Sequence, residues 1–372
     1  MKKILIATEN LYCGGVEKCL IELLDSFDYE SYKVELLLFN ELGDLIDKVN
    51  PKVEVKYIIP ENKFSNKVIN KIYKSLKTRL FRRIPRIINF YISKNEYDIE
   101  IAYMHGYITN LVSNIIDDSN KIAWIHTDIE KCDVAKNSGL EKSLEKFNHI
   151  ICVSNGVKEG VDKLSPSIKA KTKVIYNIIN KDSIKKLSME RIDYEFDNRT
   201  IIGVGRFYKV KRFDLLIKAH KLLLDDGINN KLILVGRGGA EREYRQLISE
   251  LGVEKSVDVL GYKENPYPYI LKSDVFVLSS DHEGLPTVIC EAMSLGKPIV
   301  ATQCSGAIEL VDDNKYGILT KCGDEENLKN SIKILLTNND LLTKYSTISE
   351  MRSDIFNKYT VMKQIEDVLI GM

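Results

Sequence analysis

The chain has 372 residues, of which 44% are hydrophobic and 29% charged, with a formal net charge of +1. This length is enough for two domains of ordinary size, and the composition is normal for a soluble globular protein. No apolar run approaches the ~20 residues of a transmembrane helix, and the N-terminal run is too short for a signal peptide. Seven cysteines without a C-x-x-C pair predict a reduced, cytoplasmic protein with no disulfide and no structural metal.

Short apolar runs alternate with longer helical patterns along the first part of the chain. Six strand candidates precede residue 155, namely KILIAT, KVELLLF, VEVKYI, DIEIAY, KIAWIH and HIICVS. The helical stretches between them predict βαβ units and a parallel sheet. Ligands of such sheets bind beyond the carboxyl ends of the strands, so functional residues are expected directly after each run.

A di-glycine, Gly14 and Gly15, follows the first strand candidate and precedes an amphipathic helix. Glycines at this place let the backbone approach a ligand and leave free N–H groups at a helix start. An ordinary tight turn would use the same residues. The pattern is not G-x-G-x-x-G, so a dinucleotide-binding fingerprint is not supported.

The segment 63–94 contains ten Lys or Arg and no Asp or Glu, so the rest of the chain has 44 basic and 53 acidic residues. Its apolar positions, from Ile69 to Tyr91, recur at helical spacing with a bend expected at Pro85. One interpretation is a basic amphipathic helix on an anionic membrane, where each Lys or Arg contributes roughly 1 kcal/mol. The other is a helix whose apolar row packs against its own domain. Nucleic acid is not expected, because no recognition motif accompanies the patch.

A second series of six strand candidates follows residue 199, namely TIIGVG, KLILVG, SVDVL, DVFVLSS, PIVAT and YGILT. The stretch between the two series is polar and rich in Asn and Asp, which is typical of a linker. We therefore predict an α/β protein with two doubly wound Rossmann-like domains facing a central cleft. The predicted boundaries are 1–176 for the N-terminal domain, 177–198 for the linker and 199–356 for the C-terminal domain, with a C-terminal helix at 357–372 that packs back on the first domain.

The first strand of the second series is followed by a basic loop, which contains Arg206 and Lys211 and leads into a helix near Phe213. A diphosphate group is bound by two or more cations from different directions together with backbone donors, and this loop offers both. The alternative is that the loop binds no phosphate, because loops between strands and helices are often basic.

The stretch EGLPTVICEAMSLG follows the strand candidate DVFVLSS. Pro286 suits the first position of a helix, because an N–H group at that position would have no partner within the helix. The N–H groups of Leu285, Thr287 and Val288 are then expected to be unpaired and to attract a phosphate or sugar oxygen atoms.

Two glutamates in this stretch, Glu283 and Glu291, are separated by seven residues. Glu283 can accept hydrogen bonds from hydroxyl groups beside the helix start, or it can simply cap the helix. Glu291 suits a vicinal diol such as a ribose, and the alternative is a solvent-facing helix residue. Its neighbours Ile289, Cys290, Ala292 and Met293 are apolar, which argues against an exposed position. A sugar joined to a nucleoside through a diphosphate would fit these features together.

At this point the sequence resembles a known family. EGLPTVICEAMSLGKPIVAT resembles the E-x7-E signature of the retaining GT-B glycosyltransferases of family 4, and GRFYKVKRFDLLIKA resembles their diphosphate-binding loop. VIYNIIN resembles the interdomain segment, and the di-glycine and LGYKENPYPYI also match. The resemblance covers essentially the whole chain and is closest to enzymes that build bacterial capsule, O-antigen or related glycans from UDP-sugars.

The resemblance implies a set of donor-binding residues, which are Gly14, Gly15, Arg206, Lys211, Tyr262, Lys263, Glu283, Gly284, Leu285, Pro286, Thr287 and Glu291. Glu283 would hold hydroxyls of the donor sugar and Glu291 those of the ribose. Arg206 and Lys211 would neutralise the diphosphate, with Gly15 closing over it. Residues 284–287 would line the sugar and the β-phosphate.

The resemblance also implies roles outside this set. Tyr262 and Lys263 would lie beside the base, and His126 would lie near the reacting sugar, although a satisfied core histidine is the alternative. His105 would face the acceptor. The catalytic residues would be His126, Arg206, Lys211 and Glu283, and the other histidines, at 149, 220 and 282, are interpreted as structural or surface residues.

The implied activity is transfer of a hexose or N-acetylhexosamine from a UDP-sugar to a glycan acceptor, often carried on a polyprenyl diphosphate. The family is thought to retain the anomeric configuration by front-face reaction, with leaving-group stabilisation as the main contribution. No D-x-D motif stands out, so no metal and no cofactor are expected. The expected location is cytoplasmic, peripheral at the inner face of the cell membrane. The alternatives are a UDP-sugar 2-epimerase of the same fold and a non-catalytic nucleotide-sugar-binding partner of a glycan-assembly complex.

Overall fold

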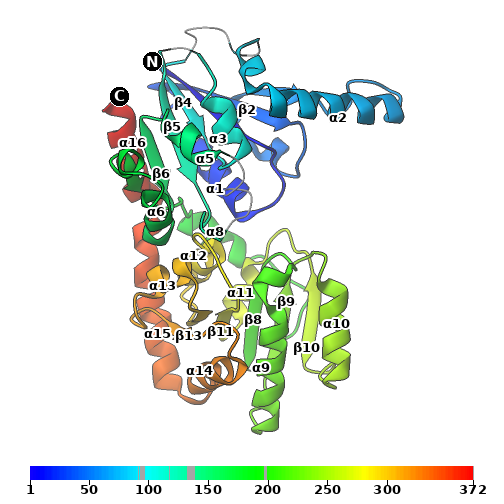
Figure 1. Ribbon diagram of the computed structural model, residues 1–372. Helices are drawn as coiled ribbons and strands as arrows, with labels where there is room; N and C mark the ends of the chain where they lie inside the picture. Colours follow the sequence, from blue (N-terminus) through cyan, green and yellow to red (C-terminus); the bar gives the residue numbers. More distant parts are fainter. Residues whose placement is uncertain (91, 93–96, 117, 132–138, 197–198, 372) are drawn as a thin grey trace. The chain divides into compact units, whose positions relative to one another are not determined.

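The computed structural model describes all residues except 91, 93–96, 117, 132–138, 197–198 and 372. The chain folds into two compact units, of which unit 1 comprises Met1–Ile178 and Lys358–Met372 and unit 2 comprises Ile179–Asn357 (Figure 1). Each unit is a parallel sheet with helices, so the predicted class of two Rossmann-like α/β units is confirmed.

Unit 1 contains a sheet of seven strands in the order β3-β2-β1-β4-β5-β6-β7. The strands are β1 (Lys2–Thr8), β2 (Tyr32–Asn40), β3 (Glu54–Ile59), β4 (Ile99–Ala102), β5 (Asn120–Ile125), β6 (His149–Cys152) and β7 (Thr172–Val174). The six predicted strands are all present. β7 was not predicted, because its three residues carry too little apolar pattern to distinguish a strand from a turn.

Unit 2 contains a sheet of six strands in the order β10-β9-β8-β11-β12-β13, matching the six predicted runs. The strands are β8 (Thr200–Val204), β9 (Lys231–Val235), β10 (Val257–Gly261), β11 (Val275–Leu278), β12 (Ile299–Thr302) and β13 (Ile318–Thr320). Their near-continuous apolar sequences fit strands that helices cover on both faces.

The helices connect these strands. In unit 1 they are α1 (Gly15–Leu24), η1 (Ile46–Lys48), α2 (Lys67–Arg83), η2 (Pro85–Phe90), α3 (Tyr107–Val112), α5 (Leu140–Leu144), α6 (Asn155–Asp162), α7 (Pro166–Lys169) and α16 (Lys358–Ile370). In unit 2 they are α8 (Lys181–Ser188), η3 (Lys209–Lys211), α9 (Phe213–Asp225), α10 (Glu241–Glu250), α11 (Tyr267–Lys272), α12 (Thr287–Ser294), α13 (Ser305–Val311), α14 (Glu325–Thr337), α15 (Asn339–Arg352) and η4 (Ser353–Phe356). Within the segment 177–198, α8 packs on α11 and α12 of unit 2.

The strand order reverses direction once in each sheet. In unit 1 the reversal lies between β1 and β4, and in unit 2 it lies between β8 and β11. At such a point the loops of neighbouring strands leave toward opposite faces of the sheet and open a space at its carboxyl edge. Most of the predicted functional residues follow these four strands, whereas His126 follows β5 and Tyr262 and Lys263 follow β10.

The basic segment forms α2, which ends where Pro85 follows Ile84. Figure 1 shows α2 extending away from the sheet of unit 1. One side of the helix is anchored to unit 1, because Phe81 is buried against Phe39 and the Lys77 ammonium donates to the Ile58 carbonyl. The opposite side carries an exposed apolar row of Val68, Ile69, Ile72, Leu76 and Leu80, whose side chains are 45–66% exposed. For these five residues the alternative in which the apolar row packs against its own domain is wrong. Ile88, further along the predicted row, is buried, and Tyr91 lies outside the described residues.

The C-terminal helix α16 belongs to unit 1 although all of unit 2 precedes it in sequence. Its buried face comprises Val361, Met362, Ile365, Val368 and Leu369. The Lys2 ammonium donates to the Leu369 carbonyl across 2.8 Å, which joins the first strand of unit 1 to its last helix. No helix in the described part of the chain is long and apolar enough to cross a membrane.

His220 is fully buried on α9 and joins three elements of unit 2. Its Nδ1 lies 2.8 Å from Asn230 Oδ1 and its Nε2 lies 2.9 Å from Ser256 Oγ. Burial lowers the pKa of His220 to about 4, while the hydrogen bond with Asn230 acts in the opposite direction. The interpretation of this residue as structural agrees with these contacts.

The lowered pKa of His220 predicts that the folded state loses stability in acid. Because the folded-state pKa lies below that of the unfolded chain, the unfolded state binds more protons between pH 6.5 and 4, and stability falls as the pH drops through that window. At pH 4.5 this single group should lower the free energy of unfolding by about 2–3 kcal/mol relative to pH 7.

Chemical denaturation of the wild type and of His220→Gln at both pH values checks this prediction. The glutamine variant should start from lower stability at pH 7 and lose less on acidification. His282→Gln, at a partly exposed histidine, is the matched control. If wild type and His220→Gln lost equal amounts of unfolding free energy on acidification, the acid sensitivity could not be assigned to His220.

Candidate functional site

The reversal point of the unit 2 sheet brings together two residues predicted from separate motifs. Lys211 ends η3, after β8, and Glu283 lies in the loop after β11. The Lys211 ammonium is 2.5 Å from Glu283 Oε1, and the two side chains are 19% and 17% exposed. A cation and a carboxylate therefore stand side by side at the carboxyl edge of β8 and β11, within reach of solvent.

The backbone around this ion pair is fixed by further hydrogen bonds. Ser279 Oγ donates to the Lys211 carbonyl over 2.8 Å, and the Asp281 amide donates to the Val210 carbonyl over 2.9 Å. Ser280 Oγ donates to Glu283 Oε1 over 2.8 Å. These bonds join the loop after β8 to the loop after β11, so the pair rests on a preorganised frame.

Glu291 lies on α12, in the second half of that helix. Its side chain is only 7% exposed, so the alternative of a solvent-facing helix residue is wrong. A carboxylate that is largely removed from water needs polar partners, which makes it a site candidate rather than a surface charge. Pro286 precedes α12 as its N-cap, with φ −72° and ψ 93°, one position before the predicted place.

The residues between Glu283 and α12 are held against α13. Leu285 and Thr287 are 7% and 8% exposed, and Gly284 and Pro286 are also buried. Ser305 Oγ and the Gly306 amide both donate to the Glu283 carbonyl. A Cβ on Gly306 would lie 2.5 Å from the Gly284 carbonyl oxygen, so a glycine is required for this close approach.

The loops after β8, β9 and β10 form a second group at the same edge. The Phe207 amide donates to the Arg237 carbonyl and the Gly236 amide to the Gly261 carbonyl, each over 2.9 Å. Arg206 is exposed, with its guanidinium 5.6 Å from the centre of the Tyr208 ring.

Two predicted residues of the third loop, Tyr262 and Lys263, follow β10. Tyr262 is 40% exposed and lies under the Arg237 guanidinium, 4.5 Å from ring centre to Cζ. The Lys263 ammonium lies 5.8 Å from the centre of the Tyr269 ring. Arg237 was not predicted, although a glycine-rich segment directly after a strand, VGRGG, was the available signal.

Arg212, next to Lys211, has an unusual backbone conformation. Its φ of 49° and ψ of 41° are left-handed, which costs a residue with a Cβ about 1–2 kcal/mol. The other non-glycine residues with positive φ in the described ranges are Asp312, Asp313 and Asn314, of types that tolerate this region. Arg212 therefore stands out as a strained position beside the candidate site.

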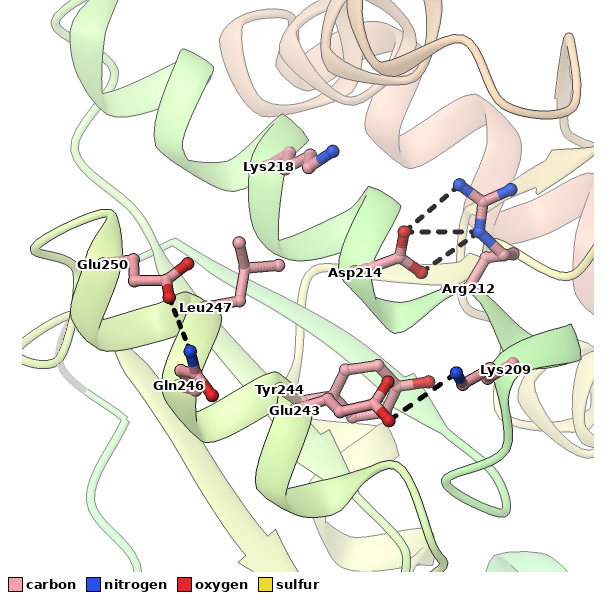
Figure 2. A pocket seen from close by; sticks show the side chains of 9 residues that line it. All are labelled: Lys209, Arg212, Asp214, Lys218, Glu243, Tyr244, Gln246, Leu247 and Glu250. Atoms are coloured by element: carbon pink, nitrogen blue, oxygen red, sulfur yellow. Dashed lines mark hydrogen bonds and ion pairs between the residues drawn. The ribbon is translucent and has the colours of Figure 1, made fainter.

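A cavity of about 460 Å³ is lined by residues of η3, α9 and α10 together with Arg212. Figure 2 shows its side chains, which pair with one another, as Lys209 does with Glu243 and Gln246 with Glu250. Three basic and three acidic side chains line it, so it has no net preference for an anion. None of the predicted donor-binding residues contributes to this cavity.

In unit 1 the di-glycine lies at the start of α1, with Gly14 as its N-cap and Gly15 as its first residue. Gly14 has extended backbone angles, and a Cβ there would lie 2.3 Å from the Glu17 carboxylate. The two glycines thus sit at a helix start after the first strand, as predicted.

His105 and His126 follow β4 and β5, which are neighbouring strands of unit 1. His126 is 7% exposed, and burial, with a smaller contribution from His105, lowers its pKa to about 3. Burial also lowers the pKa of His105. His126 is therefore a neutral imidazole at physiological pH, able to donate from one nitrogen and accept at the other.

Neither ring nitrogen of His126 has a hydrogen-bond partner among the described residues. A satisfied core histidine would have hydrogen-bond partners, so this alternative does not fit His126. A buried ring without such partners is expected to bond a ligand or a water molecule. Around it stand aromatic residues that sequence reasoning missed: Tyr103, 4.6 Å away between ring centres, and Trp124, stacked at 6.2 Å. Trp124 Nε1 and the Tyr107 hydroxyl likewise have no partner in the described part of the chain.

The described residues contain no group of three or more His, Cys, Asp or Glu side chains that could hold a metal ion. Three buried cysteines, Cys152, Cys290 and Cys304, have raised thiol pKa values because burial disfavours the thiolate. They behave as small apolar side chains.

Comparison with known proteins gives consistent matches. The family model described as "Glycosyl transferases group 1" matches residues 188–351. A curated relative from Campylobacter jejuni, N-acetylgalactosamine-N,N'-diacetylbacillosaminyl-diphospho-undecaprenol 4-alpha-N-acetylgalactosaminyltransferase, is 26% identical over 100% of both chains. The lipopolysaccharide core biosynthesis glycosyltransferase LpsE of Rhizobium meliloti is 30% identical over 52% of this chain and 56% of its own length.

Solved structures match over the full length as well. Anabaena HepE in complex with UDP and glucose is similar with a TM-score of 0.78 and 21% sequence identity, covering 100% of both chains. At this identity the likeness concerns the fold.

The packing of Gly306 predicts the effect of one added methyl group. In Gly306→Ala the Cβ would collide with the backbone of Gly284, so the loop that carries Glu283 must shift. We expect a loss of about 1–3 kcal/mol of stability from the overpacking.

Thermal unfolding of Gly306→Ala beside Gly239→Ala measures this effect. An added Cβ at Gly239 meets nothing within 4 Å, so this control should unfold like the wild type. A Gly306→Ala variant as stable as its control would show that the loop tolerates the shift.

Proposed function

We propose a specific reaction for this chain, a glycosyltransferase of the GT-B fold whose segment 188–351 matches the family model of glycosyl transferases group 1. It transfers a hexose or N-acetylhexosamine, with retention of anomeric configuration, from a UDP-sugar to a lipid-linked glycan acceptor in the synthesis of a bacterial surface polysaccharide such as a capsule or O-antigen. The names of the relatives favour a transferase over the epimerase and the non-catalytic binding partner considered from the sequence.

The observation that carries the proposal is the Lys211–Glu283 pair at the reversal point of the unit 2 sheet. Such a point is where doubly wound sheets bind nucleotides. A cation there suits the diphosphate of a donor, and a carboxylate beside it suits the hydroxyl groups of the attached sugar. The complex of HepE, a structural neighbour, with UDP and glucose supports the same donor chemistry.

We propose that the remaining donor residues act around this pair. Arg206 and Lys211 stabilise the negative charge that develops on the departing diphosphate, which is the largest contribution expected of the protein in this reaction. Glu291, buried on α12, accepts hydrogen bonds from the ribose hydroxyls. Residues 284–287 line the sugar and the β-phosphate, and Tyr262 and Lys263 lie beside the base. No metal or other cofactor takes part in the proposed reaction.

The histidines of unit 1 are proposed for the sugar and acceptor side, and Gly14 and Gly15 for the diphosphate. A neutral His126 can donate a hydrogen bond to a sugar oxygen or accept one from a hydroxyl, and both of its nitrogens are available in the described structure. Burial lowers its pKa to about 3, so the proposed role is that of a neutral imidazole at physiological pH. His126 is therefore assigned to positioning the reacting sugar, with His105 nearer the acceptor.

The acceptor is proposed to be a glycan on a polyprenyl diphosphate, which would keep the enzyme at the inner face of the cell membrane. The name of the Campylobacter jejuni relative includes a diphospho-undecaprenol acceptor. In this chain, α2 presents its exposed apolar row together with the exposed cations Lys67, Lys71, Arg79 and Arg83. An exposed apolar row among cations and without acids fits an anionic bilayer surface, where the row enters the acyl boundary and the cations meet lipid phosphates.

The nucleotide site is tested by calorimetric titration with UDP in the presence of EDTA. Wild type should bind UDP, and both Lys211→Ala and Glu291→Gln should weaken binding about tenfold or more, because each removes charge-assisted hydrogen bonds. Lys209→Ala, on the same loop but with its side chain 84% exposed, is the matched control and should bind like wild type.

Two results would revise this part of the proposal. Binding of GDP in place of UDP would keep the transferase and replace the donor. If neither nucleotide bound to wild type, the assignment of the Lys211–Glu283 pair to a donor diphosphate would fall.

Membrane contact is tested by sedimentation with vesicles that contain phosphatidylglycerol. Reversing Lys67, Lys71, Arg79 and Arg83 of α2 to Glu should reduce binding more than about a hundredfold, since each contributes roughly 1 kcal/mol at an anionic surface. Ile72→Ser with Leu76→Ser should weaken binding to the same vesicles at high salt, where the apolar row dominates.

The control reverses four exposed lysines elsewhere in the chain, at Lys142, Lys255, Lys344 and Lys363. The control variant has the same net charge as the α2 variant and should retain most of the binding. Equal binding by the α2 variant and wild type, or an equal loss in the control, would remove α2 from the membrane contact.

A further inference from the structure

We infer that Arg212 is a positioning residue, which holds the loop that carries Lys211 in register with the loop that carries Glu283. This inference rests on the proposed function of that pair as the donor diphosphate and sugar site. It assigns a task to a residue that the proposed reaction does not itself use.

The guanidinium of Arg212 spans the two loops. Its Nη1 donates to Asp281 Oδ1 over 3.1 Å, and Asp281 lies two positions before Glu283. Its Nε and Nη2 donate to the two oxygens of Asp214, each over 3.1 Å, in the first turn of α9. Figure 2 shows the Arg212 side chain turned toward Asp214. One planar group is thereby fixed by two carboxylates on different elements.

The backbone conformation of Arg212 connects this contact to the position of Lys211. Because Arg212 follows Lys211 and adopts left-handed angles, the chain turns sharply between η3 and α9, and this turn directs Lys211 toward the neighbouring loop. A glycine would take the same conformation without strain. The two carboxylates are therefore the contacts that offset the strain and keep an arginine in this turn.

The same two loops are also joined by hydrogen bonds between neutral groups. Ser279 Oγ donates to the Lys211 carbonyl and the Asp281 amide to the Val210 carbonyl. Asp281 thus uses both its backbone and its side chain to reach the loop after β8. Removing the guanidinium leaves these two bonds in place but deletes the link between the turn that carries Lys211 and the Asp281 side chain.

The ion pairs of Arg212 are too exposed to be explained by stability alone. The side chains of Arg212, Asp214 and Asp281 are 30%, 33% and 42% exposed, and pairs at such places contribute little to folding. Their effect is expected on the geometry of the loops rather than on the melting temperature. This separates a positioning role from a structural one.

Four variants test the inference, namely Arg212→Gly, Asp281→Asn, the two combined and Arg212→Lys. Arg212→Gly keeps the left-handed turn and deletes the guanidinium, and Asp281→Asn keeps the shape and deletes the charge. Arg212→Lys keeps a charge but not the forked geometry and should rescue only in part. Each is measured by UDP calorimetry with EDTA, by thermal unfolding and by amide hydrogen exchange of residues 279–284 without ligand.

We expect each single variant to weaken UDP binding about tenfold, the double variant to be no worse than either single one, and the unfolding temperature to stay near wild type. Hydrogen exchange of residues 279–284 should be faster in both single variants. Unchanged exchange and unchanged UDP affinity would overturn the inference, as would losses that simply add in the double variant.

Failure of the proposed function has a different signature. If wild type binds neither UDP nor GDP, the donor assignment falls, while the exchange rates still decide whether Arg212 fixes the loop. If wild type binds UDP and the variants bind equally well, the donor site stands and the role of Arg212 falls.

Discussion

Every strand in both sheets is parallel, and this constraint determines where the chemistry can lie. Parallel strands all finish at one edge, so each connecting helix must return across a face and each loop of interest opens at the same side. In unit 2 the loops after β8 and β11 leave that edge toward opposite faces, and Lys211 and Glu283, 72 positions apart in sequence, meet between them. The same geometry in unit 1 brings the residues after β4 and β5 together.

The predictable part of the fold is the part that depends on buried apolar runs. Twelve strands were predicted because runs such as KILIAT and DVFVLSS have a length and composition that a buried parallel strand requires. The short β7 was missed because three residues carry no period, and it is stabilised by pairing with β6 rather than by its own sequence. The break at Pro85 was predictable from the ring of proline, which disfavours helix at the preceding residue.

Site residues could be predicted only where the sequence motif also gave a physical reason for their position. Glu291 could be expected inside because apolar residues flank it, and the structure buries it. Arg237 and Tyr262 are brought together by the register of β9 and β10, which no local pattern records. The sequence alone did not decide whether the apolar row of α2 faces solvent, since a periodic apolar row looks the same whether it packs inward or is exposed. Arg212 was not singled out, because a left-handed arginine is visible only in its backbone angles.

Unit 1 is discontinuous in sequence, and this has a consequence for the order of events during synthesis. Unit 2 begins and ends at neighbouring points, where the Ile179 amide donates to the Phe356 carbonyl over 2.9 Å. It can therefore close on itself as soon as residue 357 has left the ribosome. Unit 1, although made first, lacks α16 until then and exposes the apolar surface that Val361, Ile365 and Leu369 later cover. The N-terminal half is thus the last to be completed, and it is the half that would depend on chaperones while translation continues.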